Sequence, residues 1–238
     1  MQLHLRLILP HPLRIPPGYG HQLQGAIYYA LGQKGLGDDA HDRGVPYDYG
    51  TFKLLTFGRL HGPHRFQNMQ LTFYDALDWE IRSCRQDWME ALADWYSHAG
   101  VIKLFDTMLP VEAVSLTNSR ILSSKIRIKT ETPIFLRKRS QSETGFWFPS
   151  PATPEGQTLL SRCFERRYAA FHGCLPRAGV RFSPLSPPEE VLVHYKKAIF
   201  PSWNGNFRLE GEAEALSFLF DCGLGSKTSC GLGMFHLL

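Results

Sequence analysis

The chain has 238 residues, of which 43% are hydrophobic and 20% are charged, and its formal net charge is +4. This length and composition allow one large core or two smaller ones and exclude an intrinsically disordered protein. No apolar run reaches the roughly 18 residues of a membrane-spanning helix, and the alternating start is unlike a signal peptide, so we expect a cytoplasmic protein without a membrane partner.

The cysteines and the charges narrow the class further. Five cysteines form an odd set without a Cys-x-x-Cys pair, so we expect neither a disulfide framework nor a zinc site, and no metal or other cofactor. The stretch from Arg120 to Arg139 contains seven basic residues and one acid, whereas the stretch from Asp75 to Asp94 carries six acids against two arginines. This asymmetry suggests that the second half faces a polyanion, although charge alone slightly favours a solvated face.

The first half of the chain alternates between strand and helix patterns. Residues 2–9 place leucine at every second position, which is the period of a half-buried strand, while Leu23, Ile27 and Leu31 repeat at the spacing of an amphipathic helix. A second helical stripe begins near Gln86 and ends at Gly100. The expected elements are a strand at 2–9, a helix at 21–32, strands at 52–60 and 65–74 joined by a hairpin turn at 61–64, a helix at 86–99 and a β-rich stretch at 101–116.

The second half repeats this order. Its expected elements are a strand at 125–129, a Pro-rich link at 148–154, a helix at 156–172, strands at 191–197 and 207–210, a helix at 212–221 and a last strand at 234–238. Each half therefore follows the order β-α-β-β-α-β, which is that of the ferredoxin-like fold. We predict an α+β protein of two tandem ferredoxin-like (RRM-like) domains, at residues 1–118 and 124–238, although no fixed-period repeat of residues accompanies the order.

A glycine-rich loop, residues 223–233, lies between the last predicted helix and the last strand. Gly223 is placed to cap the helix, and the loop's other glycines lack the Cβ that would block close approach of another backbone. Backbone amides, hydroxyls and Lys227 would then contact an RNA phosphate backbone without reading bases. The run Gly-Ser-Lys-Thr is not a nucleotide P-loop, which needs Gly directly before Lys and a following helix. A flexible turn is the alternative.

The spacing Gly-x-Gly-x5-Gly-x-Gly in this loop resembles the signature of the Cas6 family, the CRISPR-associated endoribonucleases that process precursor CRISPR RNA. The segment Leu23-Gln-Gly-Ala-Ile-Tyr-Tyr29 is similar to the family's opening helix, and the resemblance covers most of the chain. It implies two ferredoxin-like domains and metal-independent cleavage of CRISPR repeat RNA. In that reaction a 2′-hydroxyl attacks the adjacent phosphate and gives a 2′,3′-cyclic phosphate and a 5′-hydroxyl.

Attack by a 2′-hydroxyl requires a base, an acid for the leaving oxygen and positive charge at the phosphate. Among ten histidines we choose His41, in a polar loop after the first helix where Asp39 and Asp42 favour its charged form. Family members that retain a catalytic histidine carry it here in a Leu-His-x-x-Gly-like segment, in which Ala40 replaces the leucine. His21, at the start of the first helix, is the reserve base.

Two more residues complete the predicted active group. Tyr28 flanks the buried stripe of the first helix, so it can reach a cleft, and Lys53 opens the strand after the loop. The resemblance matches them to the family's tyrosine and lysine. Without the resemblance, the sequence favours a structural interpretation of all three residues. Tyr28 would lie at the edge of the core, Lys53 would be a solvated strand residue and His41 would be a surface histidine.

RNA binding is assigned to the loop and to basic clusters, because such clusters dominate affinity for nucleic acid. Trp203 is a candidate for base stacking, although an isolated tryptophan more often packs in a core. The predicted RNA-binding residues are Gly223, Gly225, Ser226, Lys227, Gly231 and Gly233 in the loop, with Arg137, Lys138, Arg139, Arg162 and Arg166.

The sequence thus predicts an endoribonuclease with CRISPR repeat RNA as its substrate. Other Cas proteins of an effector complex and a second copy in a homodimer are the further candidate partners. The alternatives are a non-cleaving subunit that holds repeat RNA and an unrelated tandem ferredoxin-like interaction protein. Because the loop lies in the second half and the catalytic group in the first, we expect replacement of Gly231 to weaken binding more than it alters the chemical step.

Overall fold

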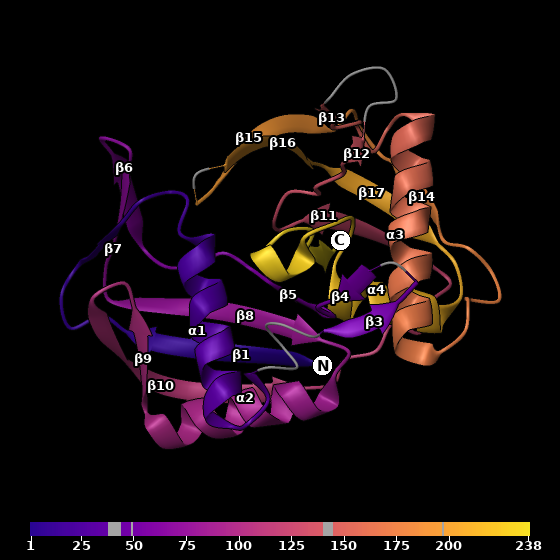
Figure 1. The fold of residues 1–238 in the computed structure, drawn as a ribbon. Helices are drawn as coiled ribbons and strands as arrows, with labels where there is room; N and C mark the ends of the chain where they lie inside the picture. The colour runs from indigo at the N-terminus through magenta and orange to yellow at the C-terminus, as the bar shows by residue number, and fades with distance from the viewer. Residues whose placement is uncertain (38–43, 49, 140–144, 197) are drawn as a thin grey trace.

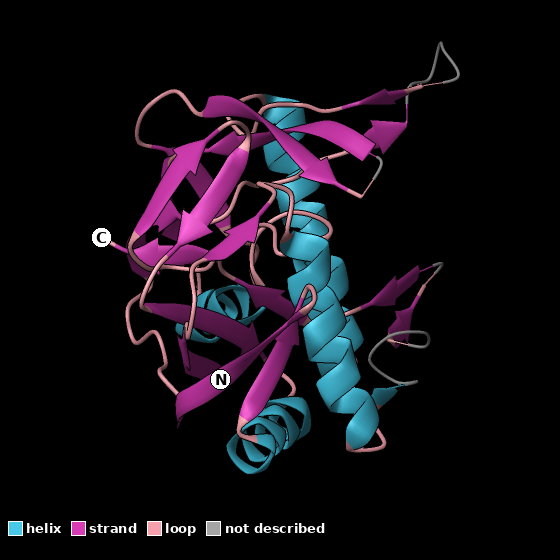
Figure 2. Cartoon of the chain, turned by 90° about the vertical axis from the view of Figure 1, so that its left-hand side faces the viewer, coloured by secondary structure: helices cyan, strands magenta, loops and turns pink. Residues whose placement is uncertain are grey.

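Two antiparallel sheets, each covered by two helices, organise the chain (Figure 1). The computed structural model describes residues 1–37, 44–48, 50–139, 145–196 and 198–238. Figure 2 shows the two sheets lying one above the other, with long helices running vertically beside them and another helix below the lower sheet. Within the described ranges, no helix combines the length and the apolar character needed to cross a membrane.

The first sheet has the strand order β5-β8-β1-β10-β9. β1 pairs on both sides, so that Leu5 lies opposite Trp79 of one neighbour and Val114 of the other. The leucines of β1 pack in one core with Ile27 and Leu92 of the two helices. The elements are β1 (Gln2–Ile8), α1 (Gly20–Gln33), β5 (Leu55–Phe57), β8 (Ala76–Ser83), α2 (Gln86–Ala99), β9 (Val101–Leu104) and β10 (Thr107–Thr117). The second, third, first and fourth strands of a β-α-β-β-α-β unit thus lie side by side, which confirms a ferredoxin-like first domain.

The predicted hairpin turn at 61–64 is wrong. β6 (His64–Gln67) pairs instead with β7 (Gln70–Phe73) across a two-residue turn, Asn68 and Met69, both of positive φ. β7 also pairs with β2 (Leu13–Ile15), so these three strands form a separate small sheet. The third strand of the domain is β8, which sequence reading missed because its acids masked the alternation of buried residues.

The second sheet repeats the arrangement with the order β14-β17-β11-β18. Its elements are β11 (Lys125–Thr130), α3 (Pro154–His172), β14 (Arg181–Pro184), β17 (Asn206–Glu210), α4 (Ala213–Cys222) and β18 (Phe235–Leu237). α3 begins where sequence rules predict, because the Thr153 hydroxyl accepts a hydrogen bond from the Gly156 amide at 3.1 Å. Tandem ferredoxin-like order is therefore confirmed for both halves, and the domain boundary at 118–124, between β10 and β11, stays a prediction.

The predicted second strand of this domain, 191–197, belongs elsewhere. β15 (Glu189–Tyr195) pairs with β16 (Ala198–Asn204) as a separate hairpin, and the prediction's last residue, Lys197, lies outside the described residues. No residue of β15 is fully buried, whereas the short strand β14 buries Phe182 in the core. Strand alternation alone therefore did not distinguish a sheet strand from a projecting hairpin.

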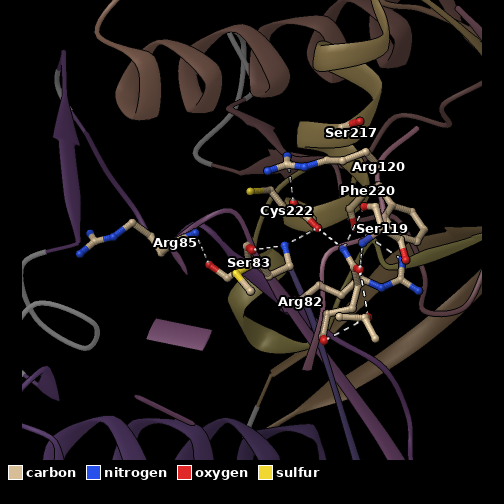
Figure 3. A network of polar contacts seen from close by, with 12 residues as sticks. Arg82, Ser83, Arg85, Ser119, Arg120, Ser217, Phe220 and Cys222 are labelled. Carbon is tan, nitrogen blue, oxygen red and sulfur yellow. Dashed lines mark hydrogen bonds and ion pairs between the residues drawn. The ribbon is translucent and has the colours of Figure 1, made fainter. Parts of the chain in front are cut away.

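Buried polar groups join the two domains (Figure 3). Arg82, at the end of β8, donates to the Phe235 carbonyl at 2.7 Å and lies 3.9 Å from the ring centroid of Phe220. The Gln2 amide donates to the buried carboxylate of Asp221 at 2.6 Å. Leu54, which precedes β5, is buried in the core of the second domain. Separating the domains would remove the hydrogen-bond partners of these buried groups, and a buried carboxylate or guanidinium without a partner costs free energy. These contacts therefore fix how the two domains pack.

Glu131 carries a pH-dependent part of this interface. Its carboxylate lies 2.6 Å from His61 Nε2 of the first domain and 3.3 Å from His236 Nε2 of β18. Burial by itself would raise the Glu131 pKa, but the hydrogen bonds and charges of the two histidines outweigh burial and lower the pKa to about 2, from an ordinary 4.5.

We expect acid to weaken the fold through this carboxyl group. Because the folded-state pKa lies below the unfolded one, the stabilisation is present above about pH 4.5 and is lost as pH falls towards 2. Solvent screening at the two half-exposed histidines limits it to about 1–2 kcal/mol. Denaturant unfolding of wild type and Glu131→Gln between pH 7 and pH 3 measures the effect. The stability difference between the two proteins should shrink with acid, and a constant difference would contradict the assignment.

Candidate active site at the glycine-rich loop

The glycine-rich loop, residues 223–233, is a packed structure rather than a flexible turn. Its four glycines have φ between +72° and +78°, a conformation that other residues adopt only with strain. Leu224 donates to the Gly233 carbonyl at 2.8 Å, and Ser226 donates to the Phe135 carbonyl at 2.8 Å. The loop also contains a 3₁₀ turn, η2 (Thr228–Cys230). The flexible-turn alternative therefore does not describe the loop.

The loop's amides are used differently from the prediction. The amides of Gly223, Gly231 and Gly233 donate to carbonyls within the protein, to Leu219, Thr228 and Pro133 respectively. These three amides are thus not available to a phosphate. The glycines shape the loop, and its outward surface consists of side chains, with Lys227 exposed.

Arg167 of α3 hydrogen-bonds to the start of the loop, and it was not among the site residues predicted from the sequence. The buried guanidinium donates to the carbonyls of Cys222 at 2.7 Å and Gly223 at 2.8 Å, where α4 ends. The only signal in the sequence was its spacing, since Arg167 continues the inward stripe of Leu160 and Phe164 along the helix. A charged residue in such a stripe indicates a buried side chain whose polar atoms are hydrogen-bonded inside the protein.

The first domain contacts the loop from the opposite side. Gln24 of α1 donates to the Ser229 carbonyl at 2.6 Å, and the Thr56 hydroxyl of β5 donates to the Leu232 carbonyl at 3.1 Å. Figure 1 shows the loop in yellow between α1 and β11, in the middle of the molecule. The loop and α1, the helix that carries Tyr28, are therefore neighbours although they lie far apart in the sequence.

Tyr28 reaches this loop as predicted for a residue at the edge of the buried stripe. Burial raises the pKa of Tyr28 above its ordinary value, although hydrogen bonding to the side chains of Ser229 and Gln24 opposes the rise. The phenol therefore keeps its proton at neutral pH. Tyr29, the next residue along α1, is exposed.

Lys53 and Lys227 line one cavity of about 260 Å³ beside the loop. Arg167 and hydroxyl groups complete the wall, and none of the ten described lining residues is acidic. Basic and hydroxyl groups without a carboxylate form an environment that suits a phosphate. The described lining residues are Thr51, Phe52, Lys53, Cys163, Arg167, Gly225, Ser226, Lys227, Thr228 and Ser229.

The predicted base, His41, lies outside the described residues. The segment that carries it resumes at Gly44, where a Cβ would lie 3.2 Å from the Lys53 side chain. The reserve candidate, His21, is not among the residues that line the cavity, because it lies at the start of α1 beside the ring of Tyr195.

The other predicted RNA-binding residues are spread over the second domain. Arg162 is exposed on α3. Arg166 instead forms an ion pair at 3.3 Å with Asp48, directly after β3 (Val45–Tyr47), and lies over the ring of Phe52 at the end of β4 (Gly50–Phe52). The cluster Arg137 to Arg139 is exposed and includes β12 (Lys138–Arg139). Trp203 is half-buried, and its backbone pairs with Ile134.

Solved structures share this whole architecture. A structure titled as a Cas6-related gene from Pyrococcus furiosus is 19% identical and covers 100% of this chain and 98% of its own, with a TM-score of 0.84. A RAMP protein described as binding different RNA substrates gives 18% identity, coverage of 100% and 99% and a TM-score of 0.83. A structure described as a Cas6 product complex is 15% identical and covers 100% of this chain and 99% of its own, with a TM-score of 0.72. At these identities the likeness shows the fold, and no curated protein matches the chain.

The fold and the loop thus define a protein of two tandem ferredoxin-like domains closed by a C-terminal glycine-rich loop. The family model described as CRISPR associated protein Cas6, C-terminal, matches residues 116–237, about half of the chain. The chain therefore belongs to the Cas6 family of CRISPR-associated proteins.

Proposed function

We propose that this protein cleaves CRISPR repeat RNA in precursor CRISPR RNA by attack of a 2′-hydroxyl on the adjacent phosphate, without a metal ion. The observation that carries the proposal is the cavity beside the glycine-rich loop, whose described lining includes Lys53 of the first domain and Lys227 of the second. Family membership and solved structures described as a RAMP protein binding RNA substrates and as a Cas6 product complex support RNA as the ligand.

The roles follow from chemistry and place. A phosphate in the cavity meets Lys53 and Lys227, whose charges stabilise the extra negative charge that develops at phosphorus during attack. Tyr28, which keeps its proton at neutral pH and hydrogen-bonds to Ser229 on the α1 side of the loop, supplies an O–H group that orients the substrate. His41 serves as the base or acid, because imidazole exchanges a proton near neutral pH.

The substrate and partner assignments follow the same reasoning. The exposed cluster Arg137 to Arg139 binds the RNA backbone outside the cavity, together with Arg162 and Arg166 of α3. Such contacts make affinity depend on salt. Repeat RNA is the primary partner, and a larger Cas complex or a second copy are further partners in the proposal.

We expect the purified protein to cleave at least one of a panel of CRISPR repeat RNAs in the presence of a chelator. The products should be a 2′,3′-cyclic phosphate and a 5′-hydroxyl, since no external water enters the first step. Mass spectrometry of the fragments distinguishes these ends from the 5′-phosphate that metal-dependent hydrolysis leaves. Tight, salt-dependent binding without cleavage would instead identify a subunit that holds repeat RNA, and no binding would reject both roles.

A further inference from the structure

A small hairpin at the edge of the second domain displays two large aromatic side chains. Phe146 and Trp147, which form β13 (Phe146–Trp147), are 55% and 47% exposed. Their strand pairs only with β12, so the hairpin belongs to neither main sheet. Aromatic rings contribute most when buried, so two adjacent exposed rings indicate a surface that a partner covers.

The charges around the rings identify the chemistry of that partner. The guanidinium of Arg137 lies 4.3 Å from the ring centroid of Phe146. Arg139 pairs with Phe146 and Lys138 pairs with Trp147 across the hairpin, and directly opposed residues share a face. Each face of the hairpin therefore combines one aromatic ring with at least one cation.

The hairpin is attached to the second domain at Phe135, the residue that also contacts the glycine-rich loop. Phe135, whose carbonyl receives the Ser226 amide, lies two residues before Arg137. Phe148, directly after β13, packs on the same Phe135 ring with centroids 5.7 Å apart. Both ends of the hairpin thus adjoin Phe135, the residue whose carbonyl supports the glycine-rich loop.

We propose that the hairpin binds two unpaired nucleobases of the RNA substrate, one stacked on Phe146 and the other on Trp147 at the opposite face, while Arg137 to Arg139 contact the flanking phosphates. This inference rests on the proposed function for its ligand. Unpaired RNA fits because every base offers a π-face that a duplex hides. A second copy of the chain fits less well, because the sequence from Arg137 to Phe148 holds three basic residues and one acid, so two copies would repel.

Binding titrations test the proposal with the CRISPR repeat RNA, from a panel, that the wild-type protein binds most tightly; if that RNA is cleaved, it carries a 2′-deoxy group at the cleavage position so that no reaction occurs. We expect Phe146→Ala and Trp147→Ala each to weaken affinity about tenfold, the usual scale for one stacked base, and Trp147→Phe to restore most of it. Phe66→Ala is the matched control, because Phe66 is 58% exposed on the unrelated hairpin of β6 and β7.

An abasic scan of the same RNA separates stacking from charge. In wild type, removal of the base that stacks on Trp147 should weaken binding about tenfold. In Trp147→Ala, removal of that same base should have no further effect. Unchanged affinity of both alanine variants overturns the proposal, as does an equal loss with every abasic RNA. A smaller oligomer in sizing experiments with unchanged RNA affinity also overturns it, in favour of a contact between copies. Because the probe cannot react, these results are independent of whether the catalytic assignment holds.

Discussion

Replacement of His41 by alanine is expected to lower the single-turnover cleavage rate of repeat RNA by about 10²–10⁴-fold, the usual contribution of a positioned acid or base. RNA affinity should change little, because the phosphate contacts in the cavity come from Lys53 and Lys227. Gel-resolved single-turnover cleavage in chelator, with affinity measured on the 2′-deoxy substrate, gives the two quantities separately. His98→Ala is the control, since His98 is an exposed histidine at the end of α2.

The pH profile distinguishes the roles of the two charged groups. If His41 exchanges the proton, His41→Ala removes the part of the profile that titrates near neutral pH. Lys53→Ala should lower the rate about a hundredfold and leave the shape of the profile unchanged, because lysine supplies charge rather than a proton. An unchanged rate in His41→Ala would reject that assignment, and a large loss in His21→Ala would transfer the role to the reserve histidine.

The order of elements could be read from the sequence, because ferredoxin-like topology depends on local patterns. Alternating leucines and the stripes of α1 and α2 fixed those elements to within one or two residues. Membership of a strand in a sheet could not be read this way. Arg65 to Tyr74 and β15 alternate as well as β8, and only tertiary pairing separates the sheet from the projecting hairpins.

The site divides along the same line. Tyr28 was placed correctly because its helical phase relative to Ile27 fixes its direction. Arg167 was missed because a buried arginine is indistinguishable in sequence from a surface one until its acceptors, the carbonyls of Cys222 and Gly223, are placed by the fold. The contact between the loop and α1 joins residues about 200 positions apart, for which no local pattern exists.

That contact revises the predicted role of Gly231. A Cβ at this position would lie 2.4 Å from the ring of Phe57, a core residue of the first domain, in addition to the strain of φ +78°. Replacing Gly231 would therefore displace the loop from the first domain and alter the cavity itself. The loop cannot act on binding alone, because its position sets the distance between Lys227 and the residues of the first domain.

Gly233→Ala is expected to destabilise the protein by about 3 kcal/mol or more, the second large effect. A Cβ there would lie 1.9 Å from the Leu224 carbonyl oxygen, a backbone atom that cannot rotate away. Strain at φ +72° adds about 1–2 kcal/mol. The clash would also break the hydrogen bond from Leu224 to the Gly233 carbonyl that closes the loop. Denaturant unfolding measures the loss.

Gly173→Ala supplies the matched control. Gly173 caps α3 with φ +75°, and a Cβ there would meet nothing within 4 Å, so this variant carries the strain without the contact and should lose only about 1–2 kcal/mol. The difference between the two variants isolates the close approach of two backbone segments at Gly233. Equal losses would mean that the loop relaxes around a Cβ, and the spacing of glycines would then be a matter of φ alone. A larger loss for Gly233, accompanied by loss of cleavage at temperatures where the variant remains folded, would show that backbone packing inside the loop holds the cavity in its working shape.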